Sequence, residues 1–175
     1  MIVDVMQLMK LPEFQNTDEG VVKQRLEGLE NLIRAYTNNN FQNRAIRFEA
    51  SSLDDRLFGA CPYIKVGDTV EITKSQVNDG LYVVKELDTN IVRLDRPMFQ
   101  ATYNLVTKVQ YPADIVQGII NLMKWEQTNR DKVGIKSETL SRYSVAYFDQ
   151  DASNQVMGYP VSLMGFLKPY MKARF

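Results

Sequence analysis

Hydrophobic residues in the N-terminal part of the chain recur every three or four positions, which is the spacing of one face of a helix. Residues 2–9 follow this pattern and predict a short helix that Pro12 ends. A second helix is predicted from a cap at Thr17 or Asp18 to about Tyr36. Its apolar stripe consists of Val22, Leu26, Leu29, Ile33 and Tyr36.

Between residues 41 and 110 the pattern changes to an alternation of apolar and polar residues, as in half-buried strands. The polar stretch 51–59 is predicted to be a loop or a short helical turn, and Asn78-Asp79-Gly80 a hairpin or bulge. The spacing of the strands and the tight turns between them indicate a small antiparallel barrel. Strands are predicted at 45–50, 69–73, 81–85, 91–94 and 102–109. The expected core is Val70, Ile72, Leu81, Val83, Ile91 and Leu94.

Helical spacing returns after Pro112, where a third helix is predicted to run to about Thr128. Residues 141–148 alternate again and predict a single strand, which must pair with the barrel or with another copy of the chain. A short last helix is predicted after Pro160, and Pro169 ends it. The residues expected to share one face of the strand are Tyr143, Val145 and Tyr147.

These patterns together predict an α+β fold with two domains. Residues 1–40 and 111–175 are expected to form a helical core, which consists of a helical hairpin, a short C-terminal helix and a tail. Residues 41–110 are expected to form an inserted small antiparallel β-barrel-like domain.

The composition narrows the possible functions. The chain of 175 residues has 21 basic and 21 acidic side chains, so its net charge is zero, whereas proteins that bind DNA phosphates usually carry a basic excess. It contains no apolar run of about 18 residues, so no membrane span is predicted. The N-terminus lacks the basic region of a signal peptide. Cys61 is the single cysteine, and it is interpreted as a small buried residue.

The sequence offers no set of residues equipped for catalysis. It has no histidine, which removes the commonest general base and the commonest metal ligand. The close acidic pairs Asp54-Asp55 and Asp149/Asp151 are interpreted as solvated turns, and the second lacks the glycine and the distal glutamate of a calcium loop. No phosphate loop or dinucleotide fingerprint is present. The protein is therefore predicted not to be an enzyme, and no cofactor or metal is expected.

Two binding functions fit this composition. The inserted domain could be a nucleic-acid-binding barrel, because it carries the aromatic residues Tyr63, Tyr82, Phe99 and Tyr103, although acidic neighbours cancel its charge. Three features instead favour protein assembly: the aromatic strand 141–148, the glycine-containing segment 153–160, and the apolar and basic tail 166–175. Each has a simpler explanation, since the strand could complete the sheet of the insert and the tail could pack on its own core.

The C-terminal third resembles the head–tail connector (adaptor) proteins of tailed bacteriophages. The resemblance rests on the helix 112–130 with Gly134-Ile135, followed by Lys136-Ser137-Glu138-Thr139-Leu140-Ser141-Arg142-Tyr143-Ser144-Val145-Ala146-Tyr147. It rests also on the closing segment Leu167-Lys168-Pro169-Tyr170-Met171-Lys172-Ala173-Arg174. The insert is similar to the β-rich additions that some members of this family carry.

The resemblance implies a structural virion protein in the neck of the particle, made in the cytoplasm of the bacterial host. Such proteins form a twelve-fold ring under the portal protein, extend the DNA channel without sequence-specific DNA binding, and receive the stopper or tail-completion protein. The expected subunit-interface residues are Arg142, Tyr143, Val145 and Tyr147. The expected portal-binding residues are Phe166, Lys168, Tyr170, Lys172, Arg174 and Phe175. Truncation after Leu167 is expected to abolish portal binding and leave the fold intact. The alternative function is a small-barrel nucleic-acid-binding protein with a helical oligomerisation part.

Overall fold

The structure is a computed structural model, and it describes residues 2–59, 61–129, 137–140, 143–146 and 155–173. It contains helices and an antiparallel sheet, so the predicted α+β class is confirmed. The chain divides into two compact units. Unit 1 contains Ile2 and Asn39–Tyr111, and unit 2 contains Val3–Asn38 and Pro112–Phe175. The domain boundaries predicted from the sequence stay a prediction.

Unit 2 begins with three helices whose ends are determined by residues close to them in the sequence. The helix α1 (Val5–Met9) starts later than predicted, because the Asp4 carboxylate accepts a hydrogen bond from the Met6 amide and caps it there. A 3-10 turn η1 (Pro12–Phe14) follows. The predicted cap of α2 (Glu19–Thr37) is confirmed at Asp18, whose carboxylate accepts from the Val21 amide at 3.1 Å. Asn38 ends α2 in the left-handed conformation.

The core of unit 2 lies between α2 and α3 (Ala113–Asn129). The α2 stripe faces this core as predicted, although Tyr36 is only half-buried. Each fully buried leucine or isoleucine stabilises the unit by roughly 1.5–3 kcal/mol relative to an exposed one. The buried residues are Val22, Leu26, Leu29 and Ile33 of α2 and Ile115, Ile119, Leu122 and Met123 of α3.

The segment after α3 differs from the prediction in two places. The predicted single strand is one half of a hairpin, in which β5 (Ser137–Leu140) pairs with β6 (Tyr143–Ala146). The sequence interpretation missed β5 because its residues include only one large apolar side chain. The predicted last helix consists of two 3-10 turns, η3 (Val161–Leu163) and η4 (Gly165–Tyr170), and Pro169 lies inside the second. The short pair β7 (Gln155–Val156) and β8 (Tyr159–Pro160) precedes them.

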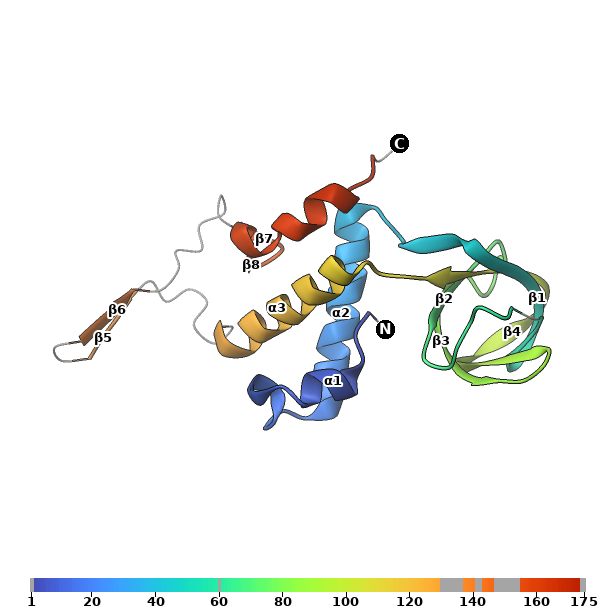
Figure 1. Cartoon of the computed structure of the whole chain (residues 1–175), viewed down its shortest axis with the longest axis horizontal. Helices are drawn as coiled ribbons and strands as arrows, with labels where there is room; N and C mark the ends of the chain where they lie inside the picture. The colour runs from blue at the N-terminus through green and yellow to red at the C-terminus, as the bar shows by residue number, and fades with distance from the viewer. Residues whose placement is uncertain (1, 60, 130–136, 141–142, 147–154, 174–175) are drawn as a thin grey trace. The chain divides into compact units, whose positions relative to one another are not determined.

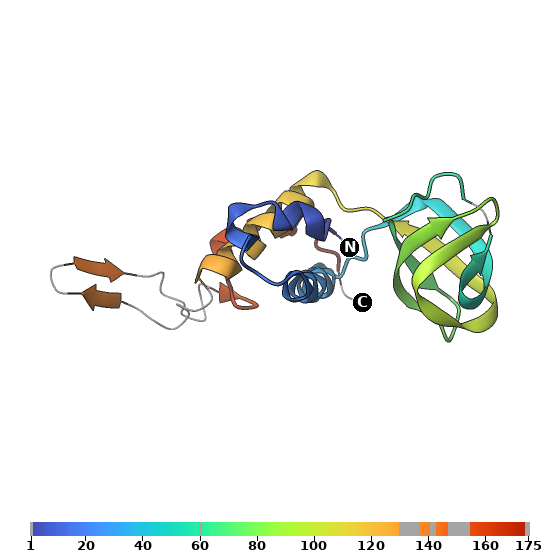
Figure 2. The ribbon, with the colours of Figure 1, turned by 90° about the horizontal axis from the view of Figure 1, so that it is seen from below.

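Unit 1 is an antiparallel sheet of four strands, β1 (Gln42–Phe58), β2 (Thr69–Thr73), β3 (Gly80–Leu87) and β4 (Ile91–Val109). The long strands β1 and β4 lie side by side (Figures 1 and 2). The strand order is β1-β4-β2-β3, and β4 also pairs with β3. These pairings do not close the sheet into a barrel, so the barrel-like arrangement stays a prediction.

The predicted loop at 51–59 is wrong, because β1 continues to Phe58. The register between β1 and β4 shifts repeatedly from Ala50 to Arg56, and Asp54 has a φ of 52°. Such bulges interrupt the alternation of buried and exposed positions, so a polar stretch can remain in a strand.

The predicted core of unit 1 is half correct. Val70, Ile72 and Leu94 are buried, whereas Leu81, Val83 and Ile91 are only partly buried. The residues that take their places are Tyr82, Val84 and Val92. Both faces of these strands are apolar in sequence, so alternation alone could not decide which face lies inside. The Tyr82 ring is accommodated because its hydroxyl donates to the Asn78 carbonyl at 3.0 Å and the Arg96 guanidinium covers one side of the ring.

A buried amide joins the strands of unit 1. The Asn78 side chain, in the connection from β2 to β3, is only 2% exposed. Its Nδ2 donates to the Ser52 hydroxyl at 3.0 Å and to the Phe99 carbonyl at 2.9 Å, and its Oδ1 accepts from the Phe99 amide at 2.8 Å. Asn104, also buried, donates to the Ala50 carbonyl. This network therefore ties the β2–β3 connection to both β1 and β4.

We predict that Asn78→Ala lowers the free energy of unfolding of unit 1 by about 3 kcal/mol, because it leaves the Phe99 amide without its partner and removes the hydrogen bonds to the Ser52 hydroxyl and the Phe99 carbonyl. Urea denaturation followed by circular dichroism measures the change. Asn90→Ala is the matched control, since Asn90 is exposed and should change stability by less than about 0.5 kcal/mol. Equal stability of the two variants would contradict the role given to the network.

Candidate functional site

The described part of the C-terminal segment packs on unit 2. Met164, Leu167 and Tyr159 are buried, and Leu167 has no exposed surface. The Tyr159 hydroxyl also donates to Glu126 of α3 at 2.6 Å. Figure 1 shows this segment, in red, beside α3 and across one end of α2, where η4 contacts both helices. The described part of the tail, 166–173, therefore contributes Leu167 to the core of unit 2 and leaves Lys168, Met171 and Lys172 exposed.

Phe166 lies against α3 at a glycine. A Cβ atom placed on Gly118 would lie 2.4–2.5 Å from three atoms of the Phe166 ring, which is far inside van der Waals contact. Only glycine therefore fits the present position of the ring. Phe166 is half-buried by this contact, so its main role in unit 2 is to fix η4 on α3.

Tyr170 is held by a carboxylate at the start of α3. Its hydroxyl lies 2.8 Å from both oxygens of Asp114, to which it donates. This hydrogen bond raises the pKa of Tyr170 above its ordinary value of 10.0, and partial desolvation and the negative charge of Asp114 act in the same direction. The interaction joins the last turn of η4 to the first turn of α3.

The residues after Tyr170 satisfy the end of α2. The Lys172 amide donates to the Thr37 carbonyl at 2.8 Å, and the Asn38 side chain donates to the Ala173 carbonyl at 2.8 Å. The last carbonyls of a helix have no partner within the helix, so a chain segment that supplies an N–H group there stabilises the helix end. The tail is thus bound to α2 through its own backbone groups, and this attachment does not require its side chains.

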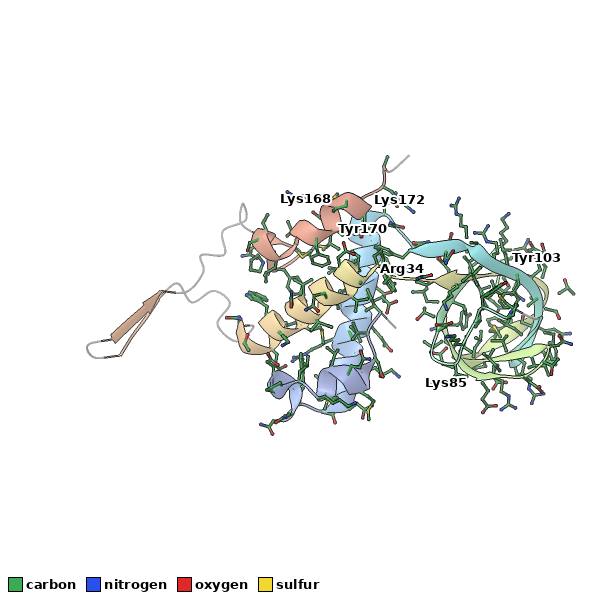
Figure 3. The ribbon with its side chains drawn as sticks, viewed as in Figure 1. Arg34, Lys85, Tyr103, Lys168, Tyr170 and Lys172 are labelled. Atoms are coloured by element: carbon green, nitrogen blue, oxygen red, sulfur yellow. The ribbon has the colours of Figure 1, made fainter. Side chains whose placement is uncertain are left out.

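A basic surface remains exposed on this fixed segment. We call it the C-terminal basic surface and define it as Arg34, Lys168, Met171 and Lys172. Lys168 and Lys172 are exposed, Met171 is 51% exposed, and Arg34 on the last turns of α2 is half-exposed. Figure 3 shows Arg34, Lys168 and Lys172 near the end of α2 that η4 contacts. The cations also suit the negative end of the α2 dipole.

The structure describes four of the six predicted portal-binding residues, and these differ in exposure and in contacts. Lys168 and Lys172 are exposed, Phe166 packs on Gly118, and Tyr170 is bound to Asp114. The other two, Arg174 and Phe175, lie outside the described residues. The expectation that truncation after Leu167 leaves the fold intact stays a prediction, although the truncation would remove the hydrogen bonds to Asp114 and Thr37.

The predicted subunit-interface residues fall on or beside the β5–β6 hairpin. Two of them, Tyr143 and Val145, pair in register with Leu140 and Glu138, so these four positions share one face of the hairpin. The opposite face carries small and polar positions, which are Ser137, Thr139, Ser144 and Ala146. Arg142 and Tyr147 lie outside the described residues.

Of the four aromatic residues considered for nucleic-acid binding, three are exposed in the structure. Tyr82 is buried, while Tyr63, Phe99 and Tyr103 are exposed. The Tyr103 hydroxyl lies 3.2 Å from a Glu49 carboxylate oxygen, and desolvation followed by this carboxylate raises the pKa of Tyr103. An acidic partner of this kind does not favour a phosphate backbone.

The part of the chain that the structure describes contains no cluster of three or more side chains that could hold a metal ion. Asp55 pairs with Arg56 and Arg93, Asp54 lies on a bulged strand, and Cys61 is half-buried against the core of unit 1. Among the described helices, none has the length and apolar character needed to span a membrane. Neither the protein-family models nor the curated proteins compared with this sequence give a match.

We predict that Tyr170→Phe lowers the stability of unit 2 at neutral pH. Because the hydrogen bond requires the protonated phenol, the stabilisation is fully present below the ordinary pKa of tyrosine and is lost as the pH rises through the raised value of the folded state. Urea denaturation at neutral and strongly alkaline pH measures the difference between the wild type and the variant. Tyr63→Phe is the control, since Tyr63 is 66% exposed. A difference that stays constant across this pH range would contradict the assignment.

Proposed function

We propose that the chain is a structural virion protein, the head–tail connector ring that docks under the portal, extends the DNA channel and presents a surface to the stopper or tail-completion protein. The proposal places it in the neck of the virion and gives it no catalytic role. The observation that carries the proposal is the C-terminal basic surface, which exposes two lysines and a methionine on a segment fixed to both α2 and α3. The sequence resemblance assigns portal binding to this same segment.

A fixed segment is well suited to dock on a large assembly. A flexible arm loses conformational freedom when it binds, whereas a segment that already has its bound shape loses little. In this proposal Lys168 and Lys172 meet acidic groups of the portal, and Met171 supplies apolar contact area. Phe166 and Tyr170 act indirectly by positioning the segment, and Arg174 and Phe175 extend the contact.

Ring formation is proposed to use the β5–β6 hairpin. A two-stranded hairpin is only marginally stable in water on its own. A contact with a neighbouring subunit would therefore stabilise it. The face that contains Leu140, Tyr143 and Val145 is the one we propose to contact the next subunit, together with Arg142 and Tyr147. A hairpin on one subunit and a different surface on the next form a heterologous interface, which closes into a ring when the rotation allows it. The proposed ring has twelve copies.

Unit 1 is proposed to be an inserted, barrel-like domain that spans 41–110 between the helical parts 1–40 and 111–175. The pairing of β4 supports this idea, since its first residues pair with β3 and its last residues pair with β2. One strand that pairs with different neighbours at its two ends favours a curled sheet. The balanced charge of the chain agrees with a channel through which DNA passes without specific binding.

We predict that the wild-type chain co-sediments with the portal protein of the same virus at about one chain per portal subunit. The double variant Lys168→Glu/Lys172→Glu should bind at least about tenfold more weakly, because it reverses the charge of the exposed lysines. The control variant Lys10→Glu/Lys85→Glu makes the same change in net charge at exposed lysines elsewhere and should bind normally.

The possible failures of this experiment have separate meanings. If the folded wild type does not co-sediment with the portal, the connector function is wrong. If the wild type and the Lys168→Glu/Lys172→Glu variant co-sediment equally, the chain binds the portal through another surface.

A further inference from the structure

Unit 1 exposes three large hydrophobic side chains that the proposed function does not use. We call them the apolar patch and define it as Leu53 of β1, Val77 of the β2–β3 connection and Phe99 of β4. Phe99 is 72% exposed, Val77 54% and Leu53 46%. The three are brought together by Asn78, which follows Val77 and bonds the backbone of Phe99 and the hydroxyl of Ser52, next to Leu53. Single exposed hydrophobic residues are common on protein surfaces, whereas a group of them indicates a contact with another molecule.

The backbone around the apolar patch is held in strained conformations. Asp54, Lys74 and Gln76 have φ angles of 52°, 60° and 69°, in the left-handed region that residues other than glycine rarely adopt. Asp54 follows Leu53, and Gln76 precedes Val77. Strain of this kind persists only where the surrounding contacts impose it, and it is common at binding sites. The buried amide network of unit 1 supplies such contacts, so the patch has its shape before anything binds.

Opposite charges flank the apolar patch on its two sides. The strand order places β1 and β2 on either side of β4. Asp54 lies on the β1 side, where it pairs with Met98 of β4, and Lys74 directly follows β2 on the other side. Both side chains are exposed. The residues next to Val77 and Phe99 in the chain are uncharged, so the middle of the patch carries no charge that a contact would have to bury.

This arrangement is complementary to itself. When two copies meet about a two-fold axis that passes near Phe99, each side of one patch faces the opposite side of the other. Leu53 then faces Val77 of the second copy, and Asp54 faces Lys74 of the second copy. No like charges are brought together, and the zero net charge of the chain gives little general repulsion. A second copy of the chain therefore matches both the apolar centre and the charged rim.

We propose that two copies of the chain associate through the apolar patch of unit 1. The two Phe99 rings pack on each other at the centre, where desolvated large side chains contribute most of the binding energy. The contact is small, because each copy supplies only three large apolar side chains, so the association is weak and reversible. A two-fold contact closes after two copies. It is therefore separate from the head-to-tail contact proposed for the ring, and its failure would leave the connector function untouched.

Sedimentation equilibrium of the full-length chain tests the proposal at concentrations up to about 1 mM, where a weak contact is populated. We expect the wild type to show a monomer–dimer equilibrium. Phe99→Ser should raise the dissociation constant of the dimer at least about tenfold, because it removes the central ring from both copies. Tyr63→Ser is the matched control, since Tyr63 is an aromatic residue of unit 1 that is 66% exposed and lies outside the patch. It should associate like the wild type.

A mixing experiment tests the two-fold geometry. Lys74→Glu and Asp54→Lys each place like charges opposite each other, so either variant alone should associate about threefold more weakly than the wild type. In an equimolar mixture the introduced lysine faces the introduced glutamate and the other rim pair is native, so association should recover. A lysine can adopt the backbone of position 54, because Lys74 itself has a left-handed φ. Lys85→Glu, an exposed lysine on β3 (Figure 3), is the charge control and should associate normally.

Four results would overturn the proposal. A wild type that stays monomeric at every concentration leaves the apolar patch to a different protein. Association of Phe99→Ser at wild-type strength places the contact elsewhere on the chain. Equal weakening by Tyr63→Ser shows unspecific hydrophobic contact, and a mixture of the two charge variants that stays weak excludes the two-fold geometry. Each variant changes an exposed side chain, so its thermal transition should match that of the wild type and shows that it is folded.

Discussion

The packing of the C-terminal segment on α2 and α3 is the constraint on which unit 2 depends. The segment places Leu167 in the core, Phe166 over Gly118, and the Lys172 amide on the last turn of α2. It thereby supplies partners to a helix end and covers an apolar face of α3, two features that would otherwise meet water. Segments distant in sequence must therefore assemble together, and residues 165–173 are part of the fold that they help to complete.

This constraint changes how the exposed basic residues can act. Backbone hydrogen bonds and buried side chains hold the segment, so Lys168 and Lys172 are displayed from a defined surface instead of a free arm. Structural and interaction roles are thus divided between neighbouring residues: Phe166 and Tyr170 face inward to α3, while the lysines face solvent.

The sequence predicted those elements whose signals are local. Asp18 and the stripe of α2 were predicted because a cap and a helical period are visible within a few residues of each other. The face of β3 that lies in the core was not predicted, because Leu81 and Tyr82 are both apolar. Which of them is buried depends on the contacts of Tyr82 with Asn78 and Arg96. The extension of β1 through 51–58 depends on bulges in its pairing with β4. The polar residues of this stretch do not indicate such bulges in the sequence. For the candidate site, Lys168 and Lys172 of the predicted tail are exposed, while their role in binding stays a prediction. The anchoring of Phe166 and Tyr170 depends on Gly118 and Asp114, about fifty residues earlier, and no local pattern could show it.

The central claim is that the C-terminal segment is a fixed part of unit 2 that presents its basic surface before any partner binds. Hydrogen–deuterium exchange on the free full-length chain, read at single amides, tests this most directly. The Leu167, Met171 and Lys172 amides donate to the carbonyls of Met164, Lys168 and Thr37. The account predicts that they exchange at least about a hundredfold more slowly than in an unfolded chain, since the Lys172 bond to α2 and the buried Leu167 hold the two local bonds in place. Exchange of these three amides at unfolded-chain rates, while α2 and α3 stay protected, would contradict it.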